Sequence, residues 1–345
     1  MTQTTTQTTT QTTTPAIQHQ VRIYEYGAPS VQRYEPIEAP VGAPGPGQVR
    51  LRHEAIGLNF VDTLFRSGAM KMPLPFGMGV EGAGVVEAVG EGVEHLQAGD
   101  RAAYFFAFGA YADARLVDAN VLVKLPDDMP ASVAASLMAK GLTAWVMLKR
   151  AHPVRRGEIV LVHGAAGGVG SLAATWAKSL GAVVIATVGT PAKAAGVRAL
   201  GIDHVLESAD PNLVAKIHAI SGGHGVDVVY ELVGKATFRQ SVLALRDGGD
   251  LIHPGSASGA PDEADKEPLA ARGIRYAQPI TGQNIPDRET LEAASAELFA
   301  AWRAGVFGAI EPRRYALSDA VRAHEDIAAR RMTGAAILVP EGAEQ

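Results

Sequence analysis

The residues most able to do chemistry form a glycine-rich turn between two apolar runs. The stretch Ile159-Val-Leu-Val-His-Gly-Ala-Ala-Gly-Gly-Val-Gly170 predicts a buried strand, a tight turn and then an alanine-rich helix over Leu172 to Leu180. Gly167 and Gly168 would let the backbone approach a pyrophosphate, and Gly170 would allow close helix–sheet packing. A helix that begins there offers free N–H groups to an anion. We therefore expect a dinucleotide site.

The turn departs from the usual G-x-G-x-x-G spacing, because Ala165 stands where the first glycine would fall. A glycine-rich turn alone is weak evidence, and a tight strand–helix turn without a ligand is the alternative. The apolar strand before the turn and the helical run after it favour the dinucleotide interpretation.

The end of the next predicted strand bears on which nicotinamide cofactor binds. NAD-specific sites place an Asp or Glu about 20 residues after the turn, on the adenosine ribose. Here the strand over Val183 to Thr187 runs into Val-Gly-Thr190 without an acid, and Lys193 follows. An open, cationic position suits a 2′-phosphate, so the sequence favours NADPH. The alternative for Lys193 is a solvated lysine on a helix face.

The composition excludes several other kinds of chemistry. The chain has no cysteine, which rules out disulfides, thiolate metal ligands and thiol nucleophiles. None of the ten histidines shows a spacing typical of metal ligands, so we expect no metal site. The net charge of −5 and scattered basic residues make nucleic acid an unlikely partner by composition.

The length of the chain and a change in its pattern of predicted strands and helices indicate two domains. The 345 residues exceed the size of a typical single core. Short β-like runs punctuated by Gly and Pro extend from Val21 to about Val123, and strand–helix alternation follows after about Gly141. A helix over Arg288 to Ala304 and a strand over Ala336 to Val339 close the chain, and that strand is expected to return to the first domain.

The two ends of the chain and its hydropathy give further expectations. Residues 1–15 form a Thr/Gln tract with almost no apolar side chains, which we expect to be disordered, although a partner-binding extension is the alternative. From the sequence we expect no apolar run long enough to span a bilayer, and the N-terminus lacks the charged and apolar regions of a secretion signal. The expected location is the cytoplasm, with no membrane partner.

Across about Val21 to Pro340, the chain resembles the zinc-independent quinone oxidoreductases, zeta-crystallin-like members of the medium-chain dehydrogenase/reductase (MDR) superfamily. The motifs that carry the resemblance are Asn59-Phe-Val-Asp-Thr63, Arg66-Ser-Gly68, Gly79-Val-Glu-Gly-Ala-Gly84, Val89-Gly-Glu-Gly92, Ala98-Gly-Asp-Arg101, Lys140-Gly-Leu-Thr143, Ala165-Ala-Gly-Gly-Val-Gly170, Thr187-Val-Gly-Thr190, Gly225-Val-Asp-Val-Val-Tyr230 and Thr333-Gly334.

The resemblance implies an α/β fold with a GroES-like β-rich catalytic domain and a Rossmann domain with a doubly wound parallel sheet. The implied boundaries are 16–142 and 283–345 for the catalytic domain and 143–282 for the NADPH-binding domain. It also implies a homodimer, whose interface we expect at an edge strand near Asp250 to His253. The zinc-dependent relatives carry a catalytic Cys where this chain has Asn59, and a Gly-His-Glu where it has Gly79-Val-Glu81. Both zinc sites are therefore expected to be absent.

The resemblance also implies a set of cofactor contacts. They are Asn59, Thr143, Gly167, Gly168, Val169, Gly189, Lys193, Ser208, Gly255, Ser256 and Arg330. Similar bacterial proteins carry Tyr where Ser208 and Leu64 stand. Ser208 can still donate to a phosphate, while Leu64 makes the expected substrate pocket more apolar.

The expected reaction is NADPH-dependent reduction of a quinone by hydride or one-electron transfer. Asn59, Leu64 and Phe108 are the expected pocket residues. Phe108 belongs to the aromatic run Tyr104 to Tyr111, which could stack on a planar acceptor or pack a hairpin core. The sequence identifies no catalytic acid. Two alternatives stay open: reduction of the C=C bond of an enone, alkenal or other conjugated carbonyl, and a sensor or structural protein that binds NADPH with little turnover.

Overall fold

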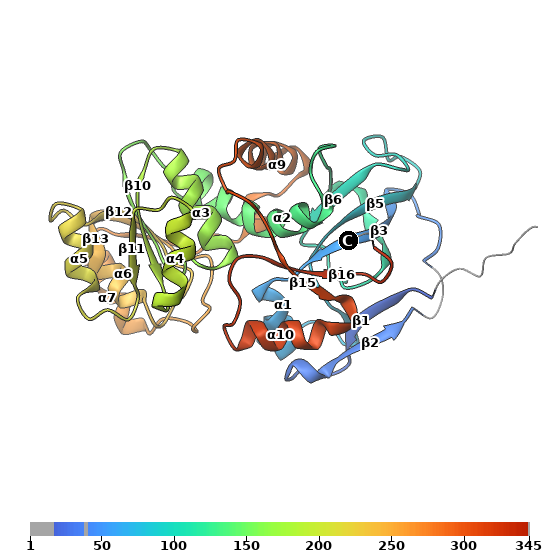
Figure 1. Cartoon of the computed structure of the whole chain (residues 1–345), viewed down its shortest axis with the longest axis horizontal. Helices are drawn as coiled ribbons and strands as arrows, with labels where there is room; N and C mark the ends of the chain where they lie inside the picture. Colours follow the sequence, from blue (N-terminus) through green and yellow to red (C-terminus); the bar gives the residue numbers. More distant parts are fainter. Residues whose placement is uncertain (1–16, 38–40, 344–345) are drawn as a thin grey trace, which may run out of the picture.

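The computed structural model describes residues 17–37 and 41–343, which form three sheets and the helices that cover them (Figure 1). The expected disorder of the Thr/Gln tract lies outside the described residues. One half of the molecule in Figure 1 contains a parallel sheet between helices, and the other contains the two remaining sheets.

The parallel sheet has six strands in the order β11-β10-β9-β12-β13-β14, and every neighbouring pair is parallel. This is the strand order 3-2-1-4-5-6 of the Rossmann fold. The strands are β9 (Ile159–Val162), β10 (Val183–Val188), β11 (His204–Glu207), β12 (Val226–Tyr230), β13 (Leu245–Ile252) and β14 (Arg275–Ala277).

Helices cover both faces of this sheet because its strands are apolar on both sides. Val160 and Val162 of β9 pack with α3 and α4, whereas Leu161 between them packs with α5, α6 and α7. The helices are α3 (Gly168–Ser179), α4 (Pro191–Ala199), α5 (Leu213–Ile220), α6 (Phe238–Ala244) and α7 (Glu267–Ala271).

The second half is built on a seven-stranded sheet in the order β15-β16-β3-β5-β6-β8, with β7 also paired to β3. A three-stranded sheet, β2-β1-β4, lies beside it. The strands are β1 (His19–Ile23), β2 (Gln32–Pro36), β3 (Gln48–Gly57), β4 (Phe76–Gly77), β5 (Glu81–Val89), β6 (Arg101–Phe105), β7 (Ala114–Asp118), β8 (Leu122–Lys124), β15 (Arg313–Ala316) and β16 (Ala336–Val339).

The closing strand β16 does return to the sheet of the N-terminal segment, pairing Ile337 with Gly57 of β3. The expected α/β fold, a β-rich part plus a Rossmann sheet, is confirmed. The domain boundaries at 142/143 and 282/283 stay predictions.

The expected edge strand at Asp250 to His253 was wrong. The short strand β14 pairs with Asp250, Leu251 and Ile252, so the edge of the sheet on this side is β14. The strand β14 follows α7, has three residues and pairs in parallel with β13. A strand of three residues is too short to show the alternating pattern by which a strand is predicted from sequence.

The helix α2 (Ala131–Trp145) runs between the two halves and continues as the π-helix η3 (Val146–Ala151) (Figure 1). The combined helix is long and apolar enough to cross a membrane by length and composition, contrary to the sequence expectation. In its most apolar window 89% of the helix is buried inside the protein, where it packs on α3, α9, β3 and β5. A helix that is apolar all round and buried is a core helix.

The remaining helices belong to the second half and to the link to it, except η4, which packs on α6 and α7 of the Rossmann half. They are α1 (Phe60–Ser67), α8 (Thr281–Asn284), α9 (Arg288–Arg303), α10 (Ala320–Ala328) and the short 3-10 helices η1 (Pro29–Val31), η2 (Ala119–Val121), η4 (Glu263–Asp265) and η5 (Leu317–Asp319).

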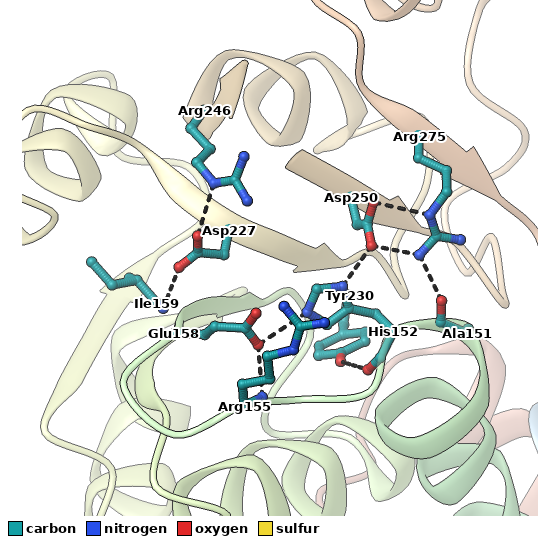
Figure 2. Close-up of polar contacts among 10 residues, drawn as sticks. All are labelled: Ala151, His152, Arg155, Glu158, Ile159, Asp227, Tyr230, Arg246, Asp250 and Arg275. Atoms are coloured by element: carbon teal, nitrogen blue, oxygen red, sulfur yellow. Dashed lines mark hydrogen bonds and ion pairs between the residues drawn. The ribbon is translucent and has the colours of Figure 1, made fainter. Parts of the chain in front are cut away.

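A group of charged residues, which we call the sheet-end cluster, ties the end of η3 to the amino end of the parallel sheet (Figure 2). His152 contacts Asp250 through Nδ1 at 2.5 Å and Glu158 through Nε2 at 3.1 Å. Arg275 donates to both oxygens of Asp250 and to the carbonyl of Ala151. Each of these side chains therefore has a polar partner within the cluster.

Candidate functional site

The expected cofactor residues of the Rossmann half follow the carboxyl ends of four parallel strands. Gly167, Gly168 and Val169 follow β9, Gly189 and Lys193 follow β10, Ser208 follows β11, and Gly255 and Ser256 follow β13. Because the strands are parallel, these positions share one edge of the sheet, where ligands of such folds bind.

The turn after β9 is shaped by close backbone contacts. Gly167 lies just before α3, and its N–H donates to the carbonyl of Gly164 at 2.9 Å. A Cβ on Gly170 would come within 2.4 Å of that carbonyl oxygen, so only glycine fits there. The N-terminus of the twelve-residue helix α3 therefore opens at the carboxyl edge of the sheet.

Lys193 and Arg330 lie together although 137 residues separate them. The Nζ of Lys193 donates to the backbone carbonyl of Arg330 at 3.2 Å. Arg330 itself has a positive φ of 55°, and its side chain is exposed. Lys193 and Gly168 also line a pocket of about 380 Å³ between α3, α4 and residues 333–335. Gly189 is exposed, and a Cβ there would meet nothing within 4 Å.

Two other expected polar contacts, Thr143 and Ser256, already have partners inside the protein. Thr143 donates to the carbonyl of Ala139 and lies 3.1 Å from the hydroxyl of Thr281. Ser256 lies 2.9 Å from Nε2 of His253. The structure thus places Ser256 at the sheet edge and Thr143 on α2, facing the segment that leads back to the second half.

Asn59 belongs to a buried set of polar residues that we call the cleft cluster: Asn59, Glu81 and Lys140. The ammonium of Lys140, on α2, donates to Oδ1 of Asn59 at 2.9 Å and lies 3.2 Å from Oε2 of Glu81, on β5. The amide Nδ2 of Asn59 donates to the same Glu81 oxygen at 2.8 Å. The side chain of Glu81 is fully buried, and that of Lys140 is 9% exposed.

Two glycines make room for the cleft cluster. A Cβ on Gly57 would come within 2.0 Å of Oε2 of Glu81 and 2.5 Å of the carbonyl oxygen of Ala135. A Cβ on Gly168 would come within 2.7 Å of Cδ of Lys140. The stem of Lys140 therefore runs over the first residue of α3, which links the cluster to the expected pyrophosphate turn.

Asp62 fixes the backbone beside the cleft cluster. It accepts from the N–H of Asn59 and from the hydroxyl of Tyr111, both at 2.9 Å, and Tyr111 also contacts His324. Burial raises the pKa of Asp62 to about 7, and burial lowers the pKa of His324 to about 3. Asn59 is the residue that precedes α1, and both its backbone N–H and its side-chain amide are hydrogen-bonded within the protein.

The expected substrate-pocket residues Leu64 and Phe108 are both half-buried. Phe108 packs edge-on against Phe65 and Phe76 and contacts Phe106, at ring-centroid distances of 5.3 to 5.5 Å. Phe65 and Phe76 are buried core rings, so Phe108 takes part in core packing, whereas its neighbour Phe106 is exposed and has a positive φ of 66°. Whether Leu64 and Phe108 contact substrate stays a prediction.

Sequence reasoning did not select Glu81 or Lys140 as site residues. Glu81 and Lys140 lay inside quoted motifs, Gly79-Val-Glu81 and Lys140-Gly-Leu-Thr143. A charged residue beside glycine in an otherwise apolar run was the available signal, because a buried charge needs a partner. That the two residues are partners, 59 positions apart, could not be read from the chain.

Among residues 17–37 and 41–343, no group of three or more His, Asp or Glu side chains lies close enough to hold a metal ion.

Two family models match the chain: "Alcohol dehydrogenase GroES-like domain" over residues 45–127 and "Zinc-binding dehydrogenase" over residues 168–300. A quinone oxidoreductase of Pseudomonas aeruginosa is 39% identical over 324 residues, covering 93% of this chain and 99% of the relative. This chain belongs to the quinone oxidoreductase family of the MDR superfamily.

Two further comparisons describe the range of the family. The crystal structure of the Escherichia coli quinone oxidoreductase complexed with NADPH matches with a TM-score of 0.89 at 36% identity, covering 93% of this chain and all of that one. A 2-haloacrylate reductase from Burkholderia is 39% identical over 329 residues, covering 92% of this chain and 98% of the relative. The family therefore includes proteins named for a quinone and for a conjugated acid.

Proposed function

We propose that the protein reduces quinones with NADPH, without a metal ion. The observation that carries the proposal is the meeting of two features: the glycine turn at the carboxyl edge of a 3-2-1-4-5-6 parallel sheet, and the cleft cluster whose lysine runs over that turn. The full-length similarity to quinone oxidoreductases, one of them crystallised with NADPH, supports it.

The residues at the sheet edge fit NADPH. The N-terminus of α3 offers N–H donors to a pyrophosphate, and Gly189 leaves open space beside the strand end. Lys193 would hold the 2′-phosphate together with Ser208 and Arg330, and no carboxylate stands at residues 186–190 to repel it. Gly167, Gly168, Val169, Gly255 and Ser256 would line the rest of the cofactor, with Thr143 and Asn59 beside the nicotinamide end.

When bound, NADPH supplies a hydride from C4 of its nicotinamide ring. The protein's own tasks are to hold the acceptor against that ring, to exclude water and to stabilise negative charge on the acceptor oxygen. Leu64 and Phe108 would form an apolar wall suited to a planar ring. The cleft cluster would lie beside that oxygen.

The test is the rate of NADPH oxidation with 1,4-benzoquinone and 9,10-phenanthrenequinone, with NADH in parallel and with or without EDTA. We expect turnover of both quinones, a preference for NADPH and no effect of EDTA. Equal use of NADH would contradict the role of Lys193, and loss of activity in EDTA would contradict a metal-free site.

A second candidate reaction is reduction of a C=C bond conjugated to a carbonyl. The observation that favours this second reaction is the similarity to a 2-haloacrylate reductase. That relative is 39% identical to this chain, the same identity as the Pseudomonas quinone oxidoreductase. An α,β-unsaturated aldehyde and 2-chloroacrylate, added to the same assay, separate the two reactions. Turnover of these compounds without turnover of quinones would move the assignment to the second reaction.

Three further expectations rest on the family resemblance. We propose a homodimer, which size-exclusion chromatography with mass measurement tests, and a monomeric mass would contradict it. We also propose a cytoplasmic location without a membrane partner, which cell fractionation tests. A sensor or structural role becomes the better account if NADPH binds tightly and none of the acceptors turns over.

A further inference from the structure

We propose that Lys140 is a catalytic residue, whose third N–H binds the acceptor oxygen on which negative charge develops during hydride transfer. The proposal rests on the proposed function, since it names the residue that stabilises the charge that reaction creates. It also gives the reason why this site can work without a metal ion: a fixed ammonium takes the place of a cationic Lewis acid.

The donors of Lys140 are not all used within the protein. An ammonium group has three N–H donors. One donates to Oδ1 of Asn59 and one to Oε2 of Glu81, at 2.9 and 3.2 Å. No third acceptor lies within hydrogen-bond distance in the part of the chain that the structure describes. A buried donor without an acceptor is costly, which is a reason to look for a ligand there.

Asn59 cannot fill the same role in this arrangement. Its Oδ1 accepts from Lys140, while its Nδ2 donates to Glu81 at 2.8 Å and to the carbonyl of Gly57 at 3.4 Å. Both N–H bonds of the amide thus already have acceptors within the protein. Asn59 and Glu81 act on the ammonium instead, fixing two of its three donor directions and so leaving the third pointing in one direction. We regard these two as positioning residues.

The surroundings of Lys140 would make its charge effective. Its side chain is almost fully buried, so charge–charge attraction there is screened less than in water. Its stem packs over Gly168 at the start of α3, beside the expected pyrophosphate turn. Glu81 balances the ammonium in the resting site, and the new oxyanion would then be the third acceptor, and the second anionic one, for the same cation.

The step balances without any further reagent. With NADPH bound, the hydride would leave the C4–H bond of the nicotinamide as one proton with two electrons and form an O–H bond at one quinone oxygen, while the other C=O bond would become C–O⁻ as the ring turns aromatic. The third N–H of Lys140 hydrogen-bonds that oxygen. One proton from water then converts the hydroquinone anion to the hydroquinone, so the sum is quinone, NADPH and one proton giving hydroquinone and NADP⁺.

The first test measures binding of a charged product mimic, independently of turnover. We would titrate 4-nitrophenol, in the presence of NADP⁺, against the wild type and Lys140→Met, and follow the phenolate absorbance as a function of pH. We expect the wild type to bind the phenolate in preference to the neutral phenol and the variant to lose this preference by about tenfold or more. Equal preference in both proteins would overturn the proposal.

The second test measures the rate of hydride transfer in a single turnover. We expect Lys140→Met to lower the single-turnover rate constant by roughly 10²- to 10³-fold, as for loss of one oxyanion donor, while the Kd for NADPH changes little. Asn59→Ala should lower this rate constant less than Lys140→Met, because the ammonium stays. The opposite ranking, or an equal loss of NADPH affinity, would assign Lys140 a structural role.

Two variants keep these tests interpretable. Glu81→Gln/Lys140→Met removes both charges together and so avoids an unpaired buried carboxylate, and it should still show the loss of phenolate preference. Lys149→Met is the matched control, since Lys149 lies further along the same continuous helix and pairs with Glu297 at 3.3 Å. If the wild type itself failed to reduce quinones but bound the phenolate through Lys140, the proposed function would fail and the anion site would stand.

Discussion

Two ionic clusters lie along the continuous helix formed by α2 and η3: the cleft cluster includes Lys140 on α2, and the sheet-end cluster lies where η3 ends. They differ in how completely their hydrogen bonds are satisfied. In the sheet-end cluster, both ring nitrogens of His152 and both oxygens of Asp250 have charged partners (Figure 2). In the cleft cluster, Lys140 is more deeply buried but has only two acceptors for three donors. A fully matched cluster supports a structural role, whereas a buried donor without a partner indicates a place for a ligand.

The difference also follows from position. The sheet-end cluster lies at the amino end of the parallel sheet, where it joins β13 and β14 to the end of η3. The cleft cluster faces the start of α3, at the carboxyl edge where α/β folds bind ligands. Perturbing the first cluster should therefore change stability, and perturbing the second should change chemistry as well.

The largest effect is expected for Gly57→Ala. The added Cβ would come within 2.0 Å of the Glu81 carboxylate and 2.5 Å of a backbone oxygen, so the cleft cluster would have to shift. We expect a loss of roughly 3–5 kcal/mol in the free energy of unfolding, from overpacking and a broken buried ion pair. Denaturant unfolding measures it, with Gly189→Ala as the control because a Cβ there meets nothing. Equal stability of the two variants would contradict the packing described here.

The next effect concerns Asp62 and pH. Burial raises its folded-state pKa to about 7, above the ordinary value of 3.8. The folded protein therefore binds more protons than the unfolded chain between about pH 4 and pH 7, and Asp62 makes stability fall as pH rises through that window. Asp62→Asn should remove this contribution, so the Tm difference between wild type and variant should change between pH 5 and pH 8. A difference independent of pH would mean that Asp62 is ionised throughout.

Asp250→Asn sharpens the comparison from the other side. Arg275 and His152 hold the pKa of Asp250 below its usual value, outweighing the opposing effect of burial. Since the folded pKa is lowered, the stabilisation is present at neutral pH and is lost as pH falls below about 4. We expect a loss of about 1–2 kcal/mol at pH 7 and unchanged kcat with quinones. A drop in kcat comparable to that of Lys140→Met would erase the distinction between the clusters.

The smallest effect is expected for Lys193→Ala, which leaves both clusters intact. Loss of a charge-assisted hydrogen bond to the 2′-phosphate should raise the KM for NADPH about tenfold and leave the KM for NADH unchanged. Initial-rate kinetics with both cofactors measure the ratio. A parallel rise with NADH would place Lys193 away from the 2′-phosphate.

The Rossmann half could be predicted well because its signals are local. The strand Ile159–Val162, the turn and α3 are continuous in sequence, and each has a short-range pattern. The second half was predicted mainly through family motifs, since β3, β5 and β16 pair across long stretches of chain. The small sheet β2-β1-β4 and the edge strand β14 were missed because runs of two to five residues carry little periodicity.

The site was predictable only in part for the same reason. Glycines and the absence of an acid after β10 marked the cofactor edge, and these are local features. The pairing of Glu81 with Lys140, and the use of both ends of the Asn59 amide, depend on three elements meeting in space. A sequence shows that such residues exist but not which of their donors remain free.

The most direct test of the account is a single-turnover measurement with EDTA-treated protein loaded with NADPH. Mixing it rapidly with 9,10-phenanthrenequinone should give decay of the reduced-nicotinamide absorbance that is fast in the wild type, equally fast in Lys149→Met and roughly 10²- to 10³-fold slower in Lys140→Met. No decay in the wild type, or the same rate in all three proteins, would contradict a metal-free site that works through the buried ammonium.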